Sequence, residues 1–170
     1  MRFEIEQKIA GPVEAVARLY TERRFYEELA GMPKLGRPEV LERREDGSLV
    51  HLAVRFRFTG NLSPAVTAVV DPAKLSWVEE SVHDLDEHAV TFRMNPDHYA
   101  DRLHSDGAVR YEPDGAGVTR RMTEAELTVR VPLLLGGGRA AGAVEGAIVS
   151  GLRDYLAAEV EVVERLLANL

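Results

Sequence analysis

The stretch LLLGGGRAAGAV, residues 133–144, joins an apolar segment to a long helical pattern through three consecutive glycines. Gly136, Gly138 and Ala141 match the spacing of a dinucleotide-binding fingerprint, so the stretch is either a phosphate loop or a hinge. A dinucleotide site needs a second parallel strand after the helix, with an acidic residue that binds the ribose. Here the helical pattern continues and no strand follows it. The hinge interpretation fits better, and no cofactor is expected.

Downstream of the glycines, apolar residues recur at spacings of three, four and seven. They predict one buried stripe of a helix over about residues 139–168, made of Val144, Ile148, Leu152, Tyr155, Val162 and Leu166. Gly142, Gly146 and Ser150 form a second stripe, of small residues, on the same helix. We expect the small stripe either to bring the helix close to a sheet or to leave a cavity beneath it.

Upstream of the glycines the apolar period is two, which is typical of half-buried strands. The predicted strands cover residues 2–9, 38–45, 50–58, 65–70, 75–82, 90–94, 103–111 and 118–131. Short turns such as Asp46-Gly47 join successive strands, which must then be antiparallel.

Two short helices are predicted after the first strand. Pro12 suits the first turn of one helix, and Thr21 is expected to cap a second helix that carries Phe25. The fold class is therefore α+β, a helix-grip fold in which a curved antiparallel sheet of about seven strands wraps on the long C-terminal helix. We expect residues 1–170 to form a single domain.

This order of elements resembles the START-like, or SRPBCC helix-grip, superfamily, which includes polyketide cyclase/dehydrase and lipid-transfer proteins. The resemblance runs from RFEIEQKI (residues 2–9) to AIVSGLRDYLAAEVEVV (residues 147–163). Residues 57–80 and NPDHYADRL (residues 95–103) resemble, more narrowly, a bacterial family of unknown function within that superfamily. The resemblance implies the fold and a largely apolar cavity between sheet and helix. It implies no catalytic residues, because the superfamily shares no catalytic motif.

Composition excludes several classes of function. The 170-residue chain has a formal net charge of −7, scattered basic residues and no cysteine. Nucleic acid and anionic membrane surfaces are therefore poor candidates as partners, since both are bound through basic faces. No apolar run approaches the roughly 20 residues that span a bilayer, so stable membrane insertion is not expected. The charged N-terminal segment does not resemble a signal peptide, and we expect a cytoplasmic location.

The densest polar cluster is NPDHYADRLHSD, residues 95–106. His98 and His104 have neighbouring aspartates, and both residue types bind zinc or non-haem iron. In an extended strand the two histidines would lie about 20 Å apart, so a solvated loop is favoured and no metal is expected. His98 with Tyr99 could instead lie at the mouth of an apolar pocket and orient or protonate a carbonyl or hydroxyl ligand.

The candidate ligand-binding residues combine apolar cavity walls with a few polar groups. They are Phe56, Trp77, Phe92, His98, Tyr99, Arg121, Leu152 and Tyr155. The register of Trp77 is ambiguous, because Leu75 and Trp77 favour one inward face of their strand whereas Val78 and Val82 favour the other. An inward Arg121 would be a buried charge in need of a partner or an anionic ligand.

Three classes of function remain open. The first is binding of a small apolar or amphipathic ligand, such as a lipid, a polyketide or a steroid-like molecule, in a cavity between sheet and helix. The second is an aromatase/cyclase-type enzyme in which His98 or Arg121 polarises a carbonyl in the same cavity. The third is a protein-interaction module without a ligand. The expected partner is a small hydrophobic molecule, the expected state is a monomer or homodimer, and no catalytic residue is assigned.

Overall fold

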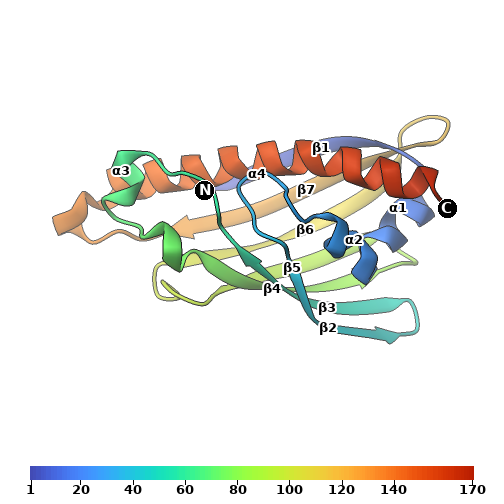
Figure 1. Ribbon diagram of the computed structural model, residues 1–170, viewed down its shortest axis with the longest axis horizontal. Helices are drawn as coiled ribbons and strands as arrows, with labels where there is room; N and C mark the ends of the chain where they lie inside the picture. Colours follow the sequence, from blue (N-terminus) through green and yellow to red (C-terminus); the bar gives the residue numbers. More distant parts are fainter.

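The computed structural model describes residues 1–170 and contains a seven-stranded antiparallel sheet crossed by one long helix, α4 (Figure 1). The strands are β1 (Arg2–Ala10), β2 (Glu39–Asp46), β3 (Leu49–Arg57), β4 (Ser76–Asp84), β5 (Ala89–Pro96), β6 (Leu103–Pro113) and β7 (Val118–Val129). The helices are α1 (Val13–Leu19), α2 (Arg23–Glu28), α3 (Pro64–Thr67) and α4 (Gly137–Ala168), with single 3-10 turns at Pro72–Lys74 and Leu133–Leu135. The predicted fold class is confirmed.

The sheet order is β1-β7-β6-β5-β4-β3-β2, so consecutive strands from β2 to β7 pair with each other. The turn between β2 and β3 contains Gly47 with a φ of 61°, a left-handed conformation that glycine adopts without strain. β1 instead pairs along its whole length with β7. This long-range pairing places the N-terminal strand at one edge of the sheet, and α1 and α2 then cover the C-terminal end of α4 (Figure 1).

The predicted strand over residues 65–70 is wrong, because this segment contains α3. The Ser63 hydroxyl accepts a hydrogen bond from the Val66 backbone N–H, and Pro64 occupies the first turn. These are signals for a helix start. The valines at 66, 69 and 70 fit helical spacing as well as they fit alternation, so the start signal decides.

The predicted capping role of Thr21 is also wrong. Its hydroxyl donates to the Arg18 carbonyl at the end of α1, and Glu22 precedes α2 without a side-chain cap. The two helices follow each other so closely that Thr21 satisfies a carbonyl left free at the end of the first one.

The glycine hinge is confirmed. Gly136 and Gly137 have φ values of 105° and 53°, and they turn the chain from the exposed Leu133 and Leu134 into α4. None of the helices is long and apolar enough to cross a bilayer.

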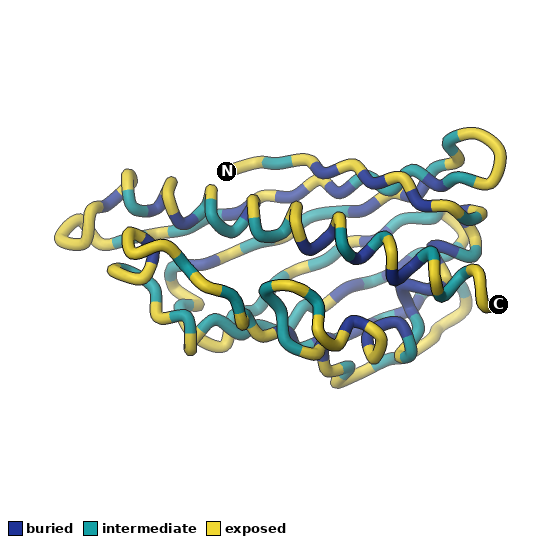
Figure 2. Tube along the Cα trace, turned by 45° about the horizontal axis from the view of Figure 1, so that its top comes forward, coloured by how far each residue is buried: buried dark blue, intermediate teal, exposed yellow.

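The small stripe of α4 does not face the sheet as expected. Gly142, Gly146 and Ser150 are exposed, and a side chain built at either glycine would meet nothing within 4 Å. The helix instead presents larger apolar residues such as Val144, Tyr155 and Val162, as the alternating burial in Figure 2 illustrates. The space beneath the helix therefore does not come from its small residues.

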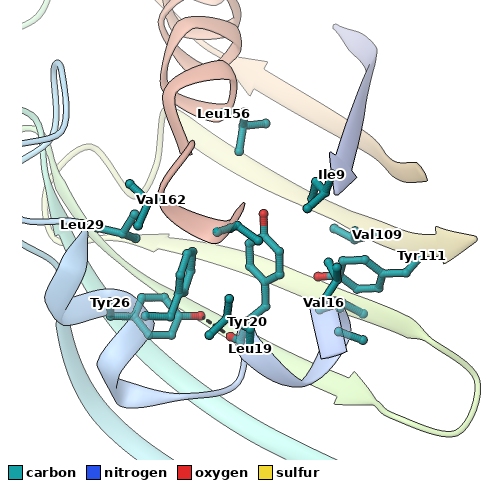
Figure 3. Close-up of a cluster of buried hydrophobic side chains, with 14 of the residues drawn as sticks. Ile9, Val16, Leu19, Tyr20, Tyr26, Leu29, Val109, Tyr111, Leu156 and Val162 are labelled. Atoms are coloured by element: carbon teal, nitrogen blue, oxygen red, sulfur yellow. Dashed lines mark hydrogen bonds between the residues drawn. The ribbon is translucent and has the colours of Figure 1, made fainter. Parts of the chain in front are cut away.

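The buried residues form a large cluster at one end of the molecule and a small one at the other. In the large cluster, Tyr20 at the end of α1 and Tyr26 of α2 pack with Leu156 and Val162 of α4 (Figure 3). The small cluster comprises Leu103, Leu127 and Val149. Between these two clusters, a cavity lies between the middle of the sheet and α4.

Gly107 of β6 is paired directly with Phe92 of β5, and glycine is required at this position. A Cβ atom at this position would lie 2.4 Å from the Glu124 carbonyl oxygen and 2.7 Å from the Phe92 ring. The backbone of the neighbouring strand cannot move away without breaking its pairing with β6. The absence of a side chain at Gly107 therefore leaves space for the Phe92 ring.

We predict opposite effects for one substitution at two glycines. Gly107→Ala should lower the free energy of unfolding by about 1–3 kcal/mol, the usual cost of overpacking. Gly142→Ala should raise it by about 0.5–1 kcal/mol, because alanine is favoured inside an exposed helix. Urea unfolding curves of both variants measure the difference, and equal effects would contradict the close contact at Gly107.

Candidate functional site

Two adjoining chambers lie between the sheet and α4. The inner chamber, of about 140 Å³, lies beside α1 and α2, and the outer chamber, of about 190 Å³, extends toward α3. Six residues line both of them: Leu35, Trp77, Glu79, Phe92, Leu152 and Tyr155. The two chambers therefore meet at a largely apolar and aromatic junction that contains one carboxyl group.

Seven of the predicted site residues line these chambers. Trp77, Phe92, Leu152 and Tyr155 line both, whereas Phe56 and Arg121 line the inner chamber and His98 the outer one. Their position is compatible with ligand contact, and ligand binding itself stays a prediction.

Tyr99 lies apart from them. It lines a separate apolar hollow beneath α3, where its hydroxyl accepts a hydrogen bond of 3.1 Å from the Asp71 backbone N–H. Tyr99 has a left-handed backbone with a φ of 61°, and His98 lines the outer chamber instead. His98 and Tyr99 therefore do not form the joint polar pair at the cavity mouth that the sequence suggested. His104 is exposed on β6.

The structure resolves the ambiguous register of β4. Trp77 faces inward and stacks on Phe56 of the paired strand, with ring centroids 5.7 Å apart and an interplanar angle of 19°. Because side chains alternate along a strand, Glu79, Ser81 and His83 follow Trp77 on the same face, and all three line the inner chamber. The buried face of β4 is thus the more polar one.

Arg121 faces inward and has a partner within the protein. Its guanidinium lies 3.6 Å from the Glu159 carboxylate and donates a 2.5 Å hydrogen bond to the Gln7 side-chain oxygen. The same group lies over the Tyr20 ring, 4.5 Å from its centre, and the Tyr20 hydroxyl donates to Glu159 at 2.6 Å. The buried charge that the sequence predicted is therefore balanced by a carboxylate from α4.

Burial changes the protonation of several cavity groups. It raises the pKa of Glu79 from 4.5 to about 7, against the opposing effect of Arg121, while Glu159 adds to the rise. Burial and the Arg121 charge lower the pKa of His83 from 6.5 to about 4. Burial also raises the pKa of Glu159, although Arg121 and the Tyr20 hydrogen bond oppose this. Near neutral pH the His83 imidazole is therefore uncharged, and the Glu79 carboxyl group is partly ionised.

Sequence reasoning missed Glu79, His83 and the pairing role of Glu159. Glu159 falls on the apolar side of α4, between Leu156 and Val162 in the buried face. A carboxylate on such a face together with an inward arginine elsewhere is a signal for a buried ion pair. Glu79 and His83 could be found only after Trp77 had been placed inward.

A family model described as a protein of unknown function, DUF2505, matches residues 4–167. The chain belongs to this family. No curated protein matches the DUF2505 chain by sequence.

Solved structures match the fold of the DUF2505 chain over nearly its whole length. TTHA0849 from Thermus thermophilus has a TM-score of 0.70 and 18% identity, covering 96% of this chain and 97% of that one. The Zhui aromatase/cyclase from Streptomyces sp. R1128 has a TM-score of 0.69 and 17% identity, with coverages of 97% and 94%. Norcoclaurine synthase from Thalictrum flavum, in complex with dopamine and hydroxybenzaldehyde, has a TM-score of 0.63 and 15% identity, with coverages of 99% and 87%. The predicted helix-grip fold is confirmed by these matches, and the predicted resemblance to a family of unknown function is confirmed by the family model.

We predict that Glu79 makes stability depend on pH. Between pH 4.5 and about 7 only the unfolded chain releases this proton, so stability falls as the pH rises through this window. Glu79→Gln removes the ionisation and should therefore stabilise the protein at pH 8, by up to about 3 kcal/mol relative to wild type, and much less at pH 4.

Chemical denaturation at a series of pH values measures this effect. Glu80→Gln is the matched control, because Glu80 is the exposed neighbour on the opposite face of β4. A pH profile for Glu79→Gln that parallels wild type would contradict the assigned burial of the carboxyl group.

Proposed function

We propose that this protein binds a small, largely apolar molecule in the chambers between the sheet and α4. The observation that carries the proposal is the junction of the two chambers, where Trp77, Phe92, Leu152 and Tyr155 enclose space that the core leaves unfilled. Ligand sites are typically concave and apolar, with a few polar groups that fix orientation. Burial of the ligand's apolar surface supplies the affinity, at about 25 cal/mol per Å².

The solved structures support this proposal through the fold alone. One norcoclaurine synthase structure is a complex with two small aromatic molecules. A protein of similar fold thus binds molecules of that size. The open chambers also speak against a protein-interaction module, for which a filled core beneath α4 would be expected.

An aromatase/cyclase-type enzyme acting in the same cavity is the second candidate function. The observation that favours it is the presence of Glu79 among aromatic side chains, because a carboxyl group with a pKa of about 7 transfers protons well near neutral pH. One solved structure of similar fold is an aromatase/cyclase. Such an enzyme would still need the apolar binding site that the first proposal describes.

Fluorescence of Trp77 tests the binding proposal directly. Trp77 is the only tryptophan and lines both chambers, so energy transfer from it to an apolar dye reports occupancy of the cavity. We expect N-phenyl-1-naphthylamine to quench Trp77 emission to saturation with a stoichiometry of one.

Two substitutions on α4 form a matched pair for this titration. Ala147 lines the outer chamber, and Ala157 is exposed on the same helix. Ala147→Phe should weaken dye binding by about tenfold or more, because the added ring occupies space that the dye needs, whereas Ala157→Phe should leave binding unchanged. Melting temperatures of both variants establish that they are folded. Absent quenching, or equal binding by the two variants, would refute the proposal.

A further inference from the structure

The buried face of β4 is polar although that of its paired neighbour is apolar. Glu79, Ser81 and His83, which we name the polar strip, occupy consecutive inward positions on β4 and line the inner chamber. The residues opposite them on β3 are Val54, Leu52 and Val50. The polar strip therefore lies in a part of the sheet that is otherwise built for apolar packing.

Two members of the polar strip have unused hydrogen-bonding capacity. His83 is only 6% exposed, and its Nε2 atom lies 3.1 Å from the Ser81 hydroxyl, but its Nδ1 atom has no partner. No side-chain hydrogen bond reaches the Glu79 carboxyl group. Buried polar atoms are normally paired, so the unpaired Nδ1 atom of His83 is unfavourable when nothing is bound to it. Both residues line the inner chamber.

The charges around the inner chamber restrict what can bind there. Arg121 and Glu159 both line it, 3.6 Å apart, and they already neutralise each other. A charged ligand group would lose its hydration, and it would be attracted by one member of the pair only while being repelled by the other. An uncharged polar group avoids both costs, since neither of its neighbours has to give up its partner.

The geometry points to the polar strip as the binding site for an uncharged oxygen group, a hydroxyl or a carbonyl, on a ligand whose apolar body fills the outer chamber. This inference rests on the proposed function. When Nε2 of His83 carries the proton, it donates to the Ser81 hydroxyl, and Nδ1 accepts a hydrogen bond from a ligand hydroxyl. When Nδ1 carries the proton, it donates to a ligand oxygen, and Nε2 accepts from the Ser81 hydroxyl. Glu79, four residues away along β4, donates when protonated to a ligand oxygen at the junction of the chambers.

Probes that share one apolar body and differ in one group test the inference. Displacement of N-phenyl-1-naphthylamine at pH 6 is measured with 2-naphthol, 2-methylnaphthalene, 2-naphthoate and 2-naphthylmethylammonium. We expect 2-naphthol to displace the dye at about tenfold lower concentration than 2-methylnaphthalene, because only the hydroxyl pairs with the polar strip. Both charged probes should displace it less well than 2-naphthol.

Matched variants locate the preference. Glu79→Met and His83→Leu should each reduce the preference for 2-naphthol severalfold while leaving the affinity for 2-methylnaphthalene unchanged or higher. Glu80→Met and His51→Leu make the same changes on the outer face of the sheet and should keep the preference.

The outcomes separate the inference from the proposed function. If the dye binds but 2-naphthol and 2-methylnaphthalene displace it equally, or a charged probe displaces it best, the inference is overturned and the apolar cavity stands. It is likewise overturned if the outer-face variants lose the preference as fully as Glu79→Met and His83→Leu do. If the dye does not bind at all, the proposed function fails first. The comparison of probes on the wild-type protein decides the matter even if a variant does not fold.

Discussion

The buried contact between Arg121 and Glu159 fixes α4 on the sheet, and the shape of the cavity depends on it. Arg121 comes from β7 and Glu159 from α4, and their charged groups lie 3.6 Å apart. Gln7 of β1 receives a hydrogen bond from Arg121 and donates one to the Leu156 carbonyl of α4. Tyr20 stacks on the guanidinium and donates to the carboxylate. Such a pair adds little net stability, but breaking it leaves an unpaired buried charge. Any other placement of α4 on the sheet is therefore disfavoured.

The chambers follow from this attachment. The C-terminal half of α4 is held by the ion pair and by the large buried cluster, whereas its N-terminal half rests on Leu103 and Leu127 through Val149. A sheet twists from strand to strand while a helix stays nearly straight, and the two chambers lie between these attachments. The cavity is thus a consequence of how a long helix meets a curved sheet, and the small residues of α4 take no part in it.

Periodicity predicted most of the fold, because periods of two and 3.6 are physically distinct over long segments. The errors fall where short-range signals compete. Residues 65–70 are too few to separate the two periods, and the Ser63-Pro64 start signal decides for a helix. The small stripe of α4 shows a different limit: spacing identifies residues that share a face, but Gly142 and Gly146 carry too little apolar surface to turn that face inward.

The candidate site was harder to predict than the fold, because alternation assumes that the buried face of a strand is the more apolar one. On β4 the outward face carries Val78 and Val82, and the inward face carries the polar strip. Only a strand that faces an open chamber can have this pattern without burying its polar groups against apolar atoms. The fold does not impose it, since β3 lies beside β4 in the same sheet and its inward face is wholly apolar, from Val50 to Phe56. Packing of the core therefore does not explain the composition of β4.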